Sequence, residues 1–139
     1  MHTGEKLDLV YWENGIYVPE ATRAISQLLR DHRRNESVDM DPALLDLLYK
    51  LHATVEAPYG IEVFSGYRSP KTNAALAAKN SGVAKKSLHM KGQAADIRIP
   101  GVRLDTVRKA ALSLQLGGVG YYRKSGFLHV DTGRVRQWS

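Results

Sequence analysis

The chain has 139 residues, a length that suits one domain around one hydrophobic core, and hydrophobic residues make up 43% of it. It contains no apolar run long enough for a membrane-spanning helix, and it has no cysteine for disulfides or thiolate ligands. The first residues, Met1–Lys6, have neither the basic nor the apolar region of a signal peptide.

The net charge of +6 is unevenly distributed. Residues 1–70 carry 7 Lys and Arg against 11 Asp and Glu, whereas residues 71–139 carry 13 against 3. A basic half suggests a polyanionic partner such as nucleic acid, anionic lipid or cell-wall polymer, and a solvated basic surface is the alternative. No zinc finger, helix-turn-helix or aromatic–basic RNA motif accompanies the charge, so we expect no nucleic-acid partner.

The first half of the chain is predicted to be mainly helical. Apolar and polar residues alternate over 6–12, which predicts a strand. A helix is predicted over 19–32, and Asp41-Pro42, an N-cap followed by a first-turn proline, opens a second helix. The second helix is predicted to enter the core through Leu44, Leu45, Leu47, Leu48, Leu51 and Val55.

The second half mixes strands and helices. In chain order we predict a short strand over 61–64, an alanine-rich helix over 72–79, a strand over 96–99, a helix over 104–114, and a hairpin of strands over 117–122 and 127–131. Together these elements predict an α+β fold in one domain, residues 1–139. About four helices pack against a small, largely antiparallel sheet.

Two of the predicted strands carry residue types that bind metals. Asp96 points away from the apolar face of its strand, and His129 does the same on the last strand of the hairpin. His89 precedes the Asp96 strand, on a loop that Gly92 allows to bend back toward the carboxylate. If the two strands are neighbours, the three side chains converge.

His89, Asp96 and His129 therefore predict a metal site. Two histidines, one carboxylate and an open fourth position are the ligand set of a catalytic zinc ion. Structural histidines held by hydrogen bonds are the alternative, and the spacing alone leaves the two interpretations balanced.

Several motifs in the same order resemble a known family. The run Ser87-x-His89-x-x-Gly92-x-Ala94-x-Asp96, followed by His129, resembles the LAS group of zinc peptidases, which includes D-alanyl-D-alanine peptidases, lysostaphin-like enzymes and the hedgehog signalling domain. The YcbK/MepK-like murein endopeptidases within that group are more closely similar. Their similarity spans nearly the whole chain and includes Ser65–Ser69, Gly82–Ser87, Gly117–Tyr122 and His129–Gly133.

The resemblance implies an LAS/hedgehog-like zinc peptidase fold in which His89, Asp96 and His129 hold Zn²⁺. It also implies that Arg68 stabilises negative charge on the scissile carbonyl or binds a substrate carboxylate. Because the family acts on the bacterial envelope, we expect the protein in the periplasm or cell envelope, with its export signal removed.

The general base departs from the family pattern. Relatives often place a glutamate three residues before the last histidine ligand, or a histidine two residues before it. Here those positions are Gly126 and Phe127, and neither can accept a proton. Asp131, on the same strand face as His129, is the local substitute, either as the base or as a residue that orients a ligand. We favour orientation.

The resemblance thus implies a zinc-dependent murein endopeptidase that hydrolyses peptide cross-links in bacterial peptidoglycan, and we expect it to be a monomer. The D-alanyl–diaminopimelate and diaminopimelate–diaminopimelate bonds are both candidate substrates. A D,D-carboxypeptidase acting on stem peptides and a non-catalytic, hedgehog-like zinc-binding module are the alternatives.

Overall fold

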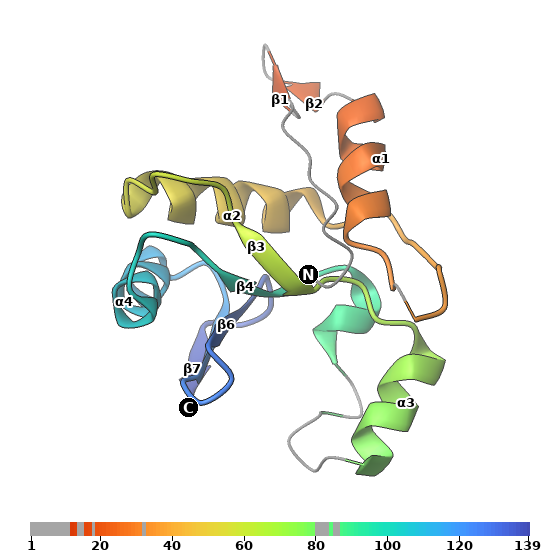
Figure 1. Cartoon of the computed structure of the whole chain (residues 1–139). Coiled ribbons are helices and arrows are strands. Elements are labelled where there is room, and N and C mark those ends of the chain that lie inside the picture. Colours follow the sequence, from red (N-terminus) through yellow and green to blue (C-terminus); the bar gives the residue numbers. More distant parts are fainter. Residues whose placement is uncertain (1–11, 14–15, 18, 32, 80–83, 85–86) are drawn as a thin grey trace.

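The computed structural model in Figure 1 describes residues 12–13, 16–17, 19–31, 33–79, 84 and 87–139. In this part of the chain, four α-helices and a five-stranded sheet form an α+β fold, which confirms the predicted fold class. The predicted strand over 6–12 lies outside the described residues except for Trp12. This residue opens a separate antiparallel pair of β1 (Trp12–Glu13) and β2 (Ile16–Tyr17). None of the described helices is long and apolar enough to cross a lipid bilayer.

Local chemistry sets where the helices begin. The four helices are α1 (Pro19–Leu28), α2 (Pro42–Thr54), α3 (Pro70–Lys79) and α4 (Leu104–Leu114). The first three start with proline, whose fixed φ suits a first helical turn and whose missing N–H has no helical partner there. Asp41 caps α2 as predicted, because its carboxylate accepts a hydrogen bond from Ala43 N at 2.9 Å.

The main sheet has the strand order β3-β4-β6-β5-β7. Its strands are β3 (Glu62–Ser65), β4 (Ala94–Arg98), β5 (Gly118–Tyr122), β6 (Phe127–Asp131) and β7 (Arg136–Trp138). Neighbours from β3 to β5 pair antiparallel, whereas β7 runs parallel to β5. The sheet is thus largely antiparallel, as predicted, with an additional edge strand that the sequence did not indicate.

The two faces of the sheet have different roles. Ile97, Leu128 and Val130 point to one face, where they are fully buried with the leucines of α2. Helix α4 contacts α2, β5 and β6 and completes this core (Figure 1). Because side chains alternate along a strand, Asp96 and His129 point to the opposite face, as predicted.

The segment after α1 holds the loop that follows β3. Helix α1 ends before the predicted boundary because Asp31 and Glu36 pair through their backbones. Beyond the helix, Leu29 O accepts a hydrogen bond from Tyr67 N at 2.7 Å. The Asp31 carboxylate accepts one from Ser69 N at 2.9 Å. These bonds fix the backbone on both sides of residue 68.

Asp31 is buried and accepts hydrogen bonds from the backbone N–H groups of Arg33, Arg34 and Ser69. Burial alone would raise its pKa, but hydrogen bonds from Thr72, Ser69 and Arg34 outweigh burial and lower the pKa below its usual value. We expect Asp31→Asn to lower the free energy of unfolding at neutral pH by about 1–3 kcal/mol, because an amide nitrogen would face some of these donors.

This effect should depend on pH with a defined sign. The folded-state pKa of Asp31 lies below the unfolded value. Its stabilisation is therefore present above about pH 4 and is lost as the pH falls through the folded-state pKa. Urea unfolding across this range should show a difference between wild type and Asp31→Asn that shrinks with acidification. Asp39→Asn, at an exposed site, is the control. A difference that does not vary with pH would contradict the assignment.

Candidate metal centre

His89 is presented by a short 3-10 helix, η1 (Leu88–Lys91), within the segment predicted as a loop. Ser87 caps this helix, since its hydroxyl accepts a hydrogen bond from His89 N at 3.1 Å. Gly92 ends it in the left-handed conformation at φ 67°, which glycine adopts readily, so the predicted bend is present.

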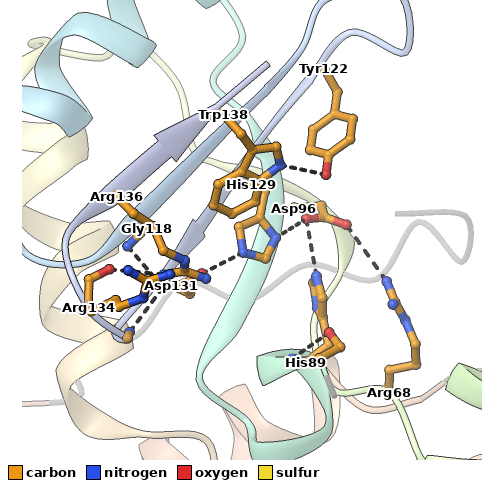
Figure 2. Close-up of polar contacts among 12 residues, drawn as sticks. Arg68, His89, Asp96, Gly118, Tyr122, His129, Asp131, Arg134, Arg136 and Trp138 are labelled. Atoms are coloured by element: carbon orange, nitrogen blue, oxygen red, sulfur yellow. Dashed lines mark hydrogen bonds and ion pairs between the residues drawn. The ribbon is translucent and has the colours of Figure 1, made fainter. Parts of the chain in front are cut away.

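Asp96 and His129 meet because β4 and β6 are adjacent. The two residues stand directly opposite each other in the antiparallel register. Asp96 Oδ1 lies 3.2 Å from His89 Nε2 and 3.0 Å from His129 Nδ1 (Figure 2). All three residues are buried, and one potential ligand atom from each lies within 4.8 Å of the others. The structure thus brings together the three residues that the sequence predicted as ligands.

Each histidine ring is held by a contact to the ring nitrogen that faces away from Asp96. His89 Nδ1 lies 2.7 Å from Gly66 O, and His129 Nε2 lies 2.8 Å from Asp131 Oδ2. A carbonyl and an ionised carboxylate can only accept hydrogen bonds, so each of these ring nitrogens carries the proton. When both rings are neutral, as metal ligation requires, the lone pairs of His89 Nε2 and His129 Nδ1 face Asp96. Two lone pairs and a carboxylate that face one another fit a divalent metal ion.

The same contacts perturb the titration of the cluster in the absence of a metal. Burial would raise the pKa of Asp96, but hydrogen bonds from His129 and His89 outweigh burial and hold it well below its usual range. Burial likewise opposes protonation of His129, whereas Asp131 and Asp96 raise its pKa. The centre therefore favours a positive charge beside Asp96, which a metal ion would supply.

The position of Gly66 depends on close packing. A Cβ at this residue would stand 2.6 Å from Leu29 O, so only glycine fits beside the segment after α1. This approach places the Gly66 carbonyl where it accepts a hydrogen bond from His89 Nδ1.

Asp131 is surrounded by donors. Its carboxylate is 0% exposed and accepts hydrogen bonds from the backbone N–H groups of Gly118 and Gly133 at 2.9 and 3.0 Å. Arg136 binds both carboxylate oxygens, at 3.0 and 2.9 Å, and His129 Nε2 completes the set. Burial would raise the pKa of Asp131, but the bonds from His129, Arg136 and Gly118 hold it well below its usual range.

Arg136 and Trp138 belong to β7 and were missed by the sequence analysis. In the parallel register Gly118 stands opposite Arg136, and Gly120 stands opposite Trp138. A Cβ at either glycine would overlap the side chain opposite it. The Trp138 ring also packs against His129, with ring centroids 5.1 Å apart. The alternating glycines in β5 were the available signal, since they mark places where other groups approach the strand closely.

Arg68 lies beside the cluster. Its Nη2 is 4.0 Å from Asp96 Oδ2, and its Nη1 donates a hydrogen bond to Asn73 Oδ1 at 3.0 Å. Its backbone N–H donates to His89 O at 3.0 Å. One edge of the guanidinium is therefore fixed by α3, while the other faces Asp96.

A cavity of about 570 Å³ opens over the cluster. Arg68, Tyr122, Phe127 and Trp138 line it together with the three cluster residues. Among the described residues, Asp96 and Asp131 are the carboxylates that line this cavity. Phe127 and Gly126 occupy the two positions at which the resemblance led us to expect a base. Phe127 contributes a ring to the cavity, and Gly126 lies in the hairpin turn at φ 79°.

Comparisons with known proteins agree with the motifs. The family model described as "Peptidoglycan L,D-endopeptidase MepK" matches residues 1–138. The "Peptidoglycan L,D-endopeptidase MepK" of Escherichia coli (strain K12) is 44% identical over 138 residues, which cover 99% of this chain and 76% of the relative. The "Probable peptidoglycan L,D-endopeptidase MepK" of Haemophilus influenzae is 43% identical over 139 residues, 99% of this chain and 75% of the relative. No solved structure gave a significant match.

The family match covers nearly the whole chain, and the relatives are similar over most of their own length. The resemblance seen in the sequence motifs is thereby confirmed. The chain belongs to the peptidoglycan L,D-endopeptidase MepK family of peptidases.

Proposed function

We propose that this protein is a zinc-dependent endopeptidase that hydrolyses peptide cross-links of peptidoglycan in the bacterial cell envelope. The observation that carries the proposal is the buried His89–Asp96–His129 cluster beneath a cavity, in a chain of this family. Nitrogen ligands with one carboxylate oxygen match the preferences of zinc. The basic second half adds a weaker argument, because a positive surface concentrates an anionic polymer.

The names of the relatives help to choose between the two candidate cross-link bonds. An L,D-endopeptidase cuts an internal amide between an L-configured and a D-configured centre. Of the two cross-links considered, the diaminopimelate–diaminopimelate bond joins an L-centre to a D-centre, whereas the D-alanyl–diaminopimelate bond joins two D-centres. We therefore propose the diaminopimelate–diaminopimelate cross-link as the preferred substrate.

His89, Asp96 and His129 would hold the metal, which when bound activates water near neutral pH and polarises the scissile carbonyl. The protein's own part begins with orientation. Gly66 O and the Asp131 carboxylate hold the two rings with one nitrogen each facing Asp96. Such partners usually raise the metal affinity of a histidine ligand and fix its tautomer.

We propose that Asp131 is a positioning residue rather than the general base. Five N–H groups occupy its two oxygens, and one of these belongs to the His129 nitrogen that faces away from Asp96. Hydrogen bonds from His129, Arg136 and Gly118 lower its pKa, which makes it a weak proton acceptor. A base needs a free lone pair within hydrogen-bond reach of the proton that it removes.

Arg68 is proposed to stabilise charge on the substrate. Amide hydrolysis places negative charge on the carbonyl oxygen, and a fixed cation beside that oxygen lowers the barrier. Asn73 holds one edge of the guanidinium, so little reorganisation is needed during the reaction. Binding of a substrate carboxylate by the same group is the alternative.

The function is tested with defined muropeptides. The zinc-loaded protein should convert dimers joined by diaminopimelate–diaminopimelate bonds to monomers, identified by mass. It should act slowly on D-alanyl–diaminopimelate dimers and on single stems that end in D-alanyl-D-alanine. His129→Ala should lose both zinc and cleavage, because it removes a ligand. His52→Ala is the matched control, since His52 bonds the Tyr59 carbonyl at 2.6 Å and lies outside the cluster.

Three other outcomes would redirect the assignment. Release of terminal D-alanine from stems while all dimers survive would indicate a D,D-carboxypeptidase. No change in any substrate with zinc bound would favour the non-catalytic, hedgehog-like module. Full zinc occupancy in His129→Ala would place the metal elsewhere.

Asp131→Asn separates the two roles of this carboxylate. Positioning predicts zinc affinity or activity reduced by about 10–100-fold, because His129 loses its charged partner. Excess zinc should then restore part of the turnover. Zinc titration and kinetics at saturating metal provide the measurement, with circular dichroism as a check on folding. Normal zinc affinity combined with abolished turnover would instead support a base.

Arg68→Ala is expected to lower turnover by about 10²–10³-fold, the usual cost of losing one donor to a developing oxyanion. Zinc content should stay at the wild-type level, because the guanidinium is not a ligand. Arg98→Ala is the control, since this arginine of β4 pairs with Glu62 at the surface. Near-normal turnover of a folded, zinc-loaded Arg68→Ala protein would remove Arg68 from the mechanism.

A further inference from the structure

The hydroxyl of Tyr122 accepts one hydrogen bond and keeps its own proton available. Trp138 Nε1 lies 2.9 Å from the hydroxyl oxygen, and because an indole N–H can only donate, the hydroxyl must accept. Among the residues that the structure describes, no acceptor is seen for the hydroxyl proton of Tyr122. A donor thus remains at the edge of the cavity.

Strand geometry places this donor on the face that carries the cluster. Gly120, His129 and Asp96 form one row across three adjacent strands. Tyr122 lies two residues beyond Gly120 in β5 and therefore points to the same face, whereas Tyr121 points toward the core. Tyr122 lines the cavity over the cluster together with Arg68. In Figure 2, Tyr122 and Arg68 lie on two sides of Asp96.

The surrounding rings hold Tyr122 in place. Its ring stacks on Phe127, with centroids 4.7 Å apart and an interplanar angle of 17°. Its partner Trp138 is held in turn, since that ring lies over Gly120, packs on His129 and carries the Arg136 guanidinium 5.1 Å from its centroid. The direction of the remaining O–H bond is therefore largely decided before a substrate arrives.

We propose that the Tyr122 hydroxyl donates a hydrogen bond to the scissile carbonyl oxygen as that oxygen gains negative charge. It would be a second donor beside Arg68, and Trp138 would be a positioning residue that acts through it. The hydroxyl keeps its proton, so no bond to hydrogen is broken at this residue. The inference rests on the proposed peptidase function. A donor fixed in advance stabilises a transition state without a cost of reorganisation.

Tyr122→Phe keeps the stacked ring and removes only the donor. We expect kcat to fall by about 10²–10³-fold, with KM and zinc content close to wild type. Tyr121→Phe is the matched control, because it removes a hydroxyl from the neighbouring residue on the core-facing side of β5. Trp138→Phe should give a smaller loss of kcat, since the hydroxyl remains but its orientation is no longer held.

Two measurements distinguish a donor from a merely structural residue. A phosphinate isostere of the diaminopimelate–diaminopimelate bond, which carries negative oxygens at the reacting centre, should bind Tyr122→Phe more weakly by about the factor lost in kcat. The monomeric cleavage product, which does not resemble the transition state, should bind wild type and Tyr122→Phe with equal affinity. In the metal-free protein, the indole N–H resonance of Trp138 should shift in Tyr122→Phe and stay in place in Tyr121→Phe.

Wild-type kcat or unchanged phosphinate affinity in Tyr122→Phe would overturn this proposal, as would a loss confined to KM. An unshifted indole resonance would overturn the hydrogen bond on which it rests. A zinc-loaded wild type that cleaves no cross-link would overturn the proposed function together with this inference. If wild type and Tyr122→Phe both cleave the cross-link at the normal rate, only the proposed role of Tyr122 is overturned.

Discussion

The pairing of β4 with β6 is the constraint on which the candidate centre depends. It sets Asp96 opposite His129 on the face that α2 and α4 leave uncovered. Ladder hydrogen bonds and a buried apolar face both hold this register. A slip of either strand by one residue would turn its own ligand side chain, Asp96 or His129, into the core and separate the pair. His89 then needs only the short helix η1 to reach the same point.

The centre is supported from two directions that are distant in sequence. From the N-terminal side, the segment after α1 holds the loop of Gly66 and Arg68, which orients His89 and places a cation beside Asp96. From the C-terminal side, β7 brings Arg136 to Asp131, which in turn orients His129. Gly66 and Asp131, which are not themselves proposed as ligands, thus determine the orientation of the two histidines that would bind the metal.

The aromatic lining of the cavity includes one of the two positions at which the resemblance led us to expect a general base. Phe127 is that residue, and its ring supports Tyr122 by stacking. Two carboxylates from the described part of the chain line the cavity. Asp96 contacts the histidines of the cluster, and Asp131 accepts hydrogen bonds from Arg136. Among the described residues, the chain offers fixed donors around the cavity, in Arg68 and Tyr122, rather than a free carboxylate. Stabilisation of developing charge is therefore the contribution that we propose for Arg68 and Tyr122.

Local signals in the sequence predicted much of the fold and the centre. Alternation with a period of two assigned Asp96 and His129 to the face opposite the core, and Asp41-Pro42 marked a helix start, because both signals act over a few residues. The tertiary structure decided what depends on distant partners. A three-residue edge strand such as β7 is too short to show a period, so only its packing against the glycines of β5 revealed it. For the same reason, the engagement of both Asp131 oxygens by Arg136 and the bond from Trp138 to Tyr122 became visible only once the strands were paired.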